Sequence, residues 1–150
     1  KILSNLILDC VFGESTEFYN KLLNDGYISP NFGGEYFTGP GFCMTMFTGD
    51  SRKPQYVAEE IKLRIKDVVA NGINEADFER TRRSHYGHAI MDYNDIDGLA
   101  NELILSSFEG FKLFDEIDIY KSITLEEANE RLKKQFDVNN CTLSVVLPKE

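Results

Sequence analysis

Residues 18–47, FYNKLLNDGYISPNFGGEYFTGPGFCMTMF, form the stretch that decides the fold of this chain. The stretch begins as the end of a helix, whose apolar face closes with Leu22 and Leu23. A turn at 24–26 follows, because Gly26 can take the left-handed conformation that commonly ends a helix without steric strain. We expect Tyr27 to be the first residue of the next strand. The stretch therefore predicts a helix, a turn and two strands joined by a loop at 38–41.

Both predicted strands are rich in aromatic and other apolar side chains that favour extended structure. The second one alternates, with Phe42, Met44 and Met46 on one face and Cys43 and Thr45 on the other. Because successive side chains of a strand point to opposite faces, this pattern predicts a strand with two chemically different sides.

Length and charge limit the classes of protein to consider. A chain of 150 residues holds one domain with a substantial core, so we expect residues 1–150 to form a single domain. The net charge of -9 disfavours a nucleic-acid partner, because phosphate binding needs clustered lysine and arginine side chains. The basic clusters at 80–83 and 133–134 lie within charged helical patterns, which usually face solvent.

The cysteines favour a reducing compartment. Cys10, Cys43 and Cys141 are odd in number and widely spaced, which argues against a disulfide framework or a cysteine-rich zinc site. We also expect apolar surroundings for all three cysteines and a cytoplasmic location for the protein. No membrane segment is expected, since no run approaches the roughly 20 apolar residues of a membrane span. The chain starts at Lys1 within an apolar helical pattern, and we expect it to be a fragment of a longer protein.

Helical patterns surround the predicted hairpin. Residues 2–23 form a helical pattern that Gly13 interrupts, and proline at the first turn favours a helix over 54–70. Asn74 is a suitable N-cap for the next helix, and Thr124 with Glu127 matches a capping box. Shorter helices are expected over 99–108 and 111–120, and the alternating run 141–147 predicts a closing strand. This order predicts an α+β fold with a small, mostly antiparallel sheet covered by helices on one face.

No metal site is predicted from these residues alone. His85 and His88 are three residues apart and could share one helix face, yet the chain has no HExxH or HxxEH motif. The alternative, that both are surface or half-buried histidines, fits the sequence better. The acidic run 92–98, DYNDIDG, lacks the spacing of a calcium loop. Because there is also no GxSxG elbow and no cysteine beside a histidine, the chain contains no complete active site.

The order of three motifs nevertheless resembles one family. The motifs are FYNKLLNDGYIS at 18–29, GINEADFERTR at 72–82, and the pair ITLEEA at 123–128 with CTLSVVLP at 141–148. In this order and spacing, the chain resembles the pitrilysin family of zinc peptidases, which includes insulin-degrading enzyme and the mitochondrial processing peptidase. More narrowly, it is similar to the carboxyl-terminal, non-zinc-binding half of a bacterial member.

The resemblance implies a role for Tyr27. In this family one half binds zinc through HxxEH, and the second half closes over the peptide substrate and supplies a tyrosine that hydrogen-bonds the scissile carbonyl. Tyr27 matches that tyrosine. The family arginine seven residues earlier is replaced by Asn20, and neighbouring Lys21 is an approximate substitute. Phe32, Gly33 and Gly34 are expected to line the substrate chamber, although a β-bulge would also explain the two glycines.

Three hypotheses follow from the sequence. The first is the substrate-enclosing half of a zinc endopeptidase, inactive alone, whose zinc is bound by an absent half or a paralogous subunit. The second is a non-peptidase homologue that acts as a scaffold or partner subunit, which Asn20 in place of arginine favours. The third is an unrelated α+β binding domain.

Overall fold

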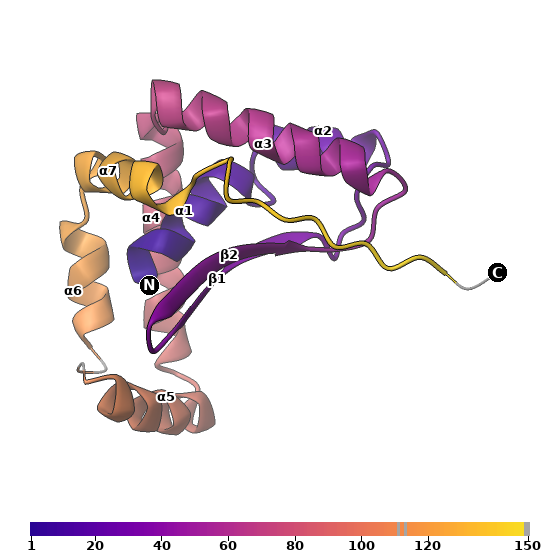
Figure 1. Ribbon diagram of the computed structural model, residues 1–150. Helices are drawn as coiled ribbons and strands as arrows, with labels where there is room; N and C mark the ends of the chain where they lie inside the picture. Colours follow the sequence, from indigo (N-terminus) through magenta and orange to yellow (C-terminus); the bar gives the residue numbers. More distant parts are fainter. Residues whose placement is uncertain (111, 113, 149–150) are drawn as a thin grey trace.

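A computed structural model describes residues 1–110, 112 and 114–148, and Figure 1 shows its course. Seven helices and a two-stranded antiparallel sheet occur within these residues, which confirms the expected α+β class. In chain order they are α1 (Ile2–Phe12), α2 (Glu17–Asn24), β1 (Gly33–Gly39), β2 (Phe42–Thr48), α3 (Pro54–Asn71), α4 (Glu75–Asp92), α5 (Ile96–Glu109), α6 (Asp115–Ser122) and α7 (Leu125–Gln135).

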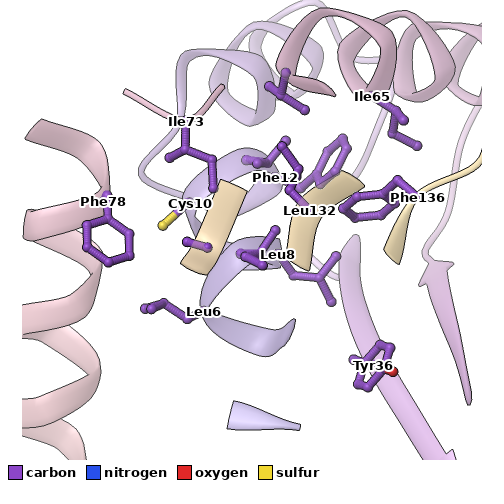
Figure 2. Packing of buried hydrophobic residues seen from close by; sticks show 14 residues of the cluster. Leu6, Leu8, Cys10, Phe12, Tyr36, Ile65, Ile73, Phe78, Leu132 and Phe136 are labelled. Atoms are coloured by element: carbon purple, nitrogen blue, oxygen red, sulfur yellow. The ribbon is translucent and has the colours of Figure 1, made fainter. Parts of the chain in front are cut away.

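Helix α1 is the centre of the packing. It contacts α2, α4, α7 and strand β1, and these elements bury most of its surface. Leu6 and Ile7 are 0% exposed, and Figure 2 shows Leu6, Leu8 and Phe12 among side chains from the surrounding elements. Burying a leucine or isoleucine side chain stabilises a fold by about 1.5–3 kcal/mol. The apolar pattern of α1 therefore accounts for much of the core.

The hairpin has one covered face and one open face. Its register pairs Tyr36 with Thr45 and Gly34 with Phe47, and this face lies against the helices. Tyr36 is buried, while its hydroxyl accepts a 2.5 Å hydrogen bond from Arg131 of α7. The opposite face presents side chains that are largely exposed: Phe42, Met44 and Met46. The two chemically different sides expected from the alternation are thus confirmed for this strand.

Most helix ends follow the residues that predicted them. Gly26 has φ +70° just after α2, and Gly72 has φ +82° just after α3. Asn74 accepts hydrogen bonds from the amides of the first turn of α4, at 2.9 and 3.3 Å. Thr124 and Glu127 form the expected capping box at the start of α7. Local chemistry therefore decides where these helices begin and end.

Two predicted strands are not formed as expected. Tyr27 does not begin a strand, because the chain turns at 29–32, where Phe32 N–H bonds to the Ser29 carbonyl at 3.0 Å and Pro30 has no N–H to donate. The first strand starts only at Gly33. Residues 141–147 are extended but form no ladder with any described residue, since β1 and β2 pair only with each other.

Two smaller expectations have other outcomes. Cys10 is buried, but Cys43 and Cys141 are exposed, so apolar surroundings hold for only one of the cysteines. The short helix expected over 111–120 begins at Asp115, and Phe111 and Leu113 lie outside the described residues. Over the same described residues, no helix combines the length and the apolar character needed to cross a membrane.

Candidate functional site

The Tyr27 backbone is held by the turn that follows α2. Its N–H donates to the Leu22 carbonyl at 2.9 Å, which closes the end of the helix. Its carbonyl accepts a 2.7 Å hydrogen bond from the Ser51 hydroxyl, which comes from the loop before α3. The position of Tyr27 therefore depends on two segments that are 24 residues apart in the sequence.

The Tyr27 side chain lies near an aromatic ring and near a cation. Its ring centroid is 4.5 Å from that of Tyr56 on α3, with an interplanar angle of 44°. The ammonium group of Lys53 lies 5.5 Å from the centroid of the Tyr27 ring. The Tyr27 hydroxyl forms no hydrogen bond with any residue in the described part of the chain, so its O–H can donate to a ligand.

Negative charge near this pair acts on Tyr56. Partial burial and the neighbouring Glu60 carboxylate raise the pKa of the Tyr56 phenol above its ordinary value. Both effects disfavour the phenolate. Tyr56 is therefore a neutral phenol at physiological pH, and its ring acts as the support against which Tyr27 packs.

Asn20 is engaged in local structure. Its side-chain amide donates to the Glu14 carbonyl at 2.8 Å and to the Thr16 carbonyl at 2.9 Å. These bonds fix the loop between α1 and α2. Lys21 is exposed on α2, and its ammonium group forms no ion pair with the described residues. Neither side chain is among the contacts of Tyr27.

Phe32, Gly33 and Gly34 line a cavity of about 460 Å³ that Tyr27 does not line. The cavity lies between the end of α1, the start of β1 and α4. Its polar lining from α4 consists of Arg80, Thr81, Ser84, His85 and His88. The predicted site residues are thus divided: three of the substrate-binding residues line this cavity, the catalytic candidate Tyr27 lies beside Lys53 and Tyr56, and Asn20 and Lys21 belong to neither group.

One wall of the cavity carries a chain of hydrogen bonds between three helices. His85 Nε2 on α4 lies 2.6 Å from Asp9 Oδ2 on α1, and His85 Nδ1 lies 3.3 Å from the Tyr120 hydroxyl on α6. Burial, and secondarily Glu116, raise the pKa of the Tyr120 phenol far above its ordinary value. Tyr120 is therefore a hydrogen-bonding group here and not a base.

The described residues of this chain do not fit a zinc site. Both ring nitrogens of His85 already have partners, and His88 is exposed. Within the ranges that the structure describes, no group of three or more His, Cys, Asp or Glu side chains is arranged to hold a metal ion. Zinc binding requires three or four such ligands around one point.

Sequence reasoning missed Lys53 and Tyr56. The residues from Tyr27 to Lys53 include the whole hairpin, and no local motif connects the two ends. Near Lys53, the sequence offers only Pro54 and Ser51 as local patterns, and both predict where the helix starts. The contact exists because the hairpin returns the chain to the end of α2.

Comparison with known proteins identifies the fold. No family model matches the chain. Over 148 residues the chain is 28% identical to the uncharacterized zinc protease YmfH of Bacillus subtilis strain 168, in a match that covers 97% of the chain and 34% of the relative. A crystal structure described as that of an M16-like peptidase from Alicyclobacillus acidocaldarius agrees with a TM-score of 0.85 at 29% identity, over 93% of this chain and 34% of that one.

These matches define the chain as one part of an M16-like peptidase fold. Both matched proteins carry peptidase names, which agrees with the resemblance to the pitrilysin family that the order of the sequence motifs indicated. The chain spans about a third of the length of each of the two proteins that it matches.

Proposed function

We propose that this chain is part of the substrate-enclosing, carboxyl-terminal half of a zinc-dependent endopeptidase. The zinc would be held outside these residues, in the other half or in a paralogous subunit. The proposal is supported by the likeness to a zinc protease and to an M16-like peptidase, each about three times as long as the matched segment. In this proposal residues 1–150 form a single domain that is inactive alone, and the whole protein is cytoplasmic.

The proposal depends most on the setting of the Tyr27 hydroxyl. The ring is supported by Tyr56 and the backbone by Ser51, while the O–H group has no partner in the described residues. A fixed donor of this kind can bind a peptide carbonyl oxygen and the negative charge that develops on it during hydrolysis. Removing one such donor typically costs a factor of about 100 to 1,000 in turnover.

Phe32, Gly33 and Gly34 are proposed to contact the peptide at the cavity. Space is open beside Gly33, because a Cβ atom added there would meet no atom within 4 Å. The outer edge of β1 pairs with no other strand in the described chain, so its backbone groups are free to bind an extended peptide. The cavity would thus hold a part of the substrate away from the scissile bond.

The test is peptide cleavage by the full-length protein with Tyr27 replaced by phenylalanine. We expect Tyr27→Phe to lower kcat/KM for an unstructured peptide by on the order of 100-fold. Its unfolding midpoint should not change, because the lost hydroxyl has no partner among the described residues. Tyr86→Phe on α4 is the matched control, since Tyr86 lies in neither the Tyr27 contacts nor the cavity lining.

Zinc content and turnover decide the outcome. Near-stoichiometric zinc in the full-length protein together with impaired Tyr27→Phe supports the proposal. Equal turnover of Tyr27→Phe and Tyr86→Phe would remove Tyr27 from the reaction. Zinc bound stoichiometrically by residues 1–150 would contradict the assignment of zinc to another part of the protein.

A non-peptidase scaffold or partner subunit is the second candidate, and Asn20 favours it. The residue that stands where the resemblance implies a substrate-gripping arginine is occupied with the carbonyls of Glu14 and Thr16. A full-length protein that binds no zinc, cleaves no peptide and co-purifies with a zinc-binding paralogue would support this function instead.

A further inference from the structure

Lys53 is held beside Tyr27 by its backbone as well as by its side chain. Its N–H donates to the Ser51 hydroxyl at 3.0 Å, and its carbonyl accepts the Val57 N–H at 3.1 Å in the first turn of α3. The Ser51 hydroxyl also donates to the Tyr27 carbonyl, at 2.7 Å. One serine therefore fixes both residues with respect to each other.

The charge of Lys53 is available to a ligand. Its ammonium group lies over the Tyr27 ring, at 5.5 Å from the centroid, and forms no ion pair with the described residues. Some other surface cations do have an acidic partner nearby: Lys62 pairs with Glu59 at 2.9 Å, and Arg80 pairs with Asp77 at 2.7 Å. A cation over an aromatic face keeps its hydrogen-bond donors free.

We propose that Lys53 binds the backbone of the peptide substrate, next to the carbonyl that Tyr27 binds. This inference rests on the proposed function and adds to it the cationic group of that site. An extended peptide advances by roughly 3.3 Å per residue, so neighbouring donors can reach carbonyl oxygens of neighbouring residues. Asn20 is bonded to backbone carbonyls of its own loop, and Lys21 has no contact with Tyr27, so neither supplies this cation at Tyr27.

The experiment compares four variants of the full-length protein with an unstructured peptide. Lys53→Met removes the charge and keeps the length of the side chain, and Lys53→Arg restores a cation. Lys66→Met, which changes an exposed lysine within α3, is the matched control. Lys21→Met tests the competing cation. We expect Lys53→Met to raise KM about tenfold and to change kcat less than twofold, while Lys53→Arg restores most of the affinity.

The same variants are compared by equilibrium binding of a fluorescent form of the peptide, which does not require turnover. The inference is supported if Lys53→Met loses at least threefold in affinity and Lys53→Arg restores it. This holds even if Tyr27→Phe is fully active, because that result would contradict only the proposed role of Tyr27. Equal affinities of Lys53→Met and Lys66→Met overturn the inference. A loss confined to Lys21→Met overturns it as well, because the cation would then lie on α2.

Discussion

At the scale of single residues, the three cysteines differ more than their sequence contexts suggested. Cys10 on α1 is 3% exposed and lies within the main core, whereas Cys43 and Cys141 are exposed. Burial raises the pKa of the Cys10 thiol from 9.0 to about 11. A buried thiol with this pKa is uncharged and unreactive at neutral pH, so its role is to fill the core.

We expect Cys10 to make the protein less stable in alkali. Because the folded pKa is higher than the unfolded one, its contribution is complete below pH 9 and is lost as the pH rises from 9 through about 11. The loss in the free energy of unfolding is about 2 to 3 kcal/mol over this interval. Urea unfolding of Cys10→Ala and wild type, each from pH 7 to 11 in reductant, measures the difference.

Cys10→Ala should lose less stability over that pH interval than wild type, because it lacks the buried thiol whose pKa is raised. Parallel pH dependence of wild type and Cys10→Ala would show that the thiol is not responsible.

At the scale of elements, α7 is the helix whose start is most completely specified by its own sequence. The Glu127 amide donates to Thr124 Oγ1 at 3.2 Å, and the Thr124 amide donates to the Glu127 carboxylate at 2.9 Å. These bonds to Thr124 hold the pKa of the Glu127 carboxyl below its ordinary value. The capping box is joined to the core because Ala128, one residue later, is 0% exposed.

Thr124→Ala should lower the free energy of unfolding by about 1 kcal/mol, the usual cost of losing an N-cap side chain. Thr124→Ser keeps the hydroxyl and should retain most of the stability. The measurement is chemical denaturation at pH 7, and the difference should shrink as the pH falls through the lowered pKa of Glu127. An alanine variant as stable as the serine variant would mean that the box contributes nothing.

The hairpin is the element that depends most on its surroundings. A two-stranded sheet is marginal in water by itself, and here α1 covers one of its faces. Arg131 of α7 adds hydrogen bonds to Ser4 Oγ at 3.0 Å and to the Tyr36 hydroxyl at 2.5 Å, so that α1, β1 and α7 are joined at one point. The hairpin is therefore stable only as part of the helical packing.

At the scale of the whole molecule, the core is a set of contacts made by α1 with elements from both ends of the chain. Leu132 of α7 is 0% exposed, and Figure 2 shows it beside Phe12 and Phe136. Residues more than 100 positions apart thus form one cluster. A change in α7 must act on α1 and on the hairpin that it supports.

Leu132→Ala should reduce the free energy of unfolding by about 2 to 5 kcal/mol, because a large side chain is removed from a filled core. Leu63→Ala on α3 is the matched control, since Leu63 is 56% exposed, and it should change stability by less than about 0.5 kcal/mol. Thermal and chemical denaturation of both variants measure these values. Equal stabilities of the two variants would contradict the central position of the α1–α7 contact.

The surface of the molecule also bears on the proposed function. Large apolar side chains are exposed on the open face of the hairpin, on α5 and in the extended carboxyl-terminal segment, including Phe42, Met44, Leu103, Phe108 and Leu147. Exposed apolar surface of this kind is typical of regions that contact another domain or protein. It agrees with the proposal that this domain works against another part of a longer protein.

The sequence by itself determined several helix boundaries, the α+β class and the resemblance to one family. Caps such as Asn74 and Thr124 and the left-handed Gly26 act within a few residues, so their effects can be predicted without the fold. The order of motifs indicated the family resemblance for the same reason, because each motif is a local unit of helix end, turn or cap. The candidate role of Tyr27 was inferred only from that order of motifs.

Tertiary structure decided where strands pair and what surrounds Tyr27. Extended residues become a strand only if a partner supplies backbone hydrogen bonds. The segment 141–147 has no such partner among the described residues, and the turn at 29–32 delays the start of β1 to Gly33. Lys53 and Tyr56 reach Tyr27 because the hairpin folds back on itself, a contact over at least 26 residues that no local pattern encodes. The site of Tyr27 therefore arises from long-range packing, whereas the elements that carry it arise from local chemistry.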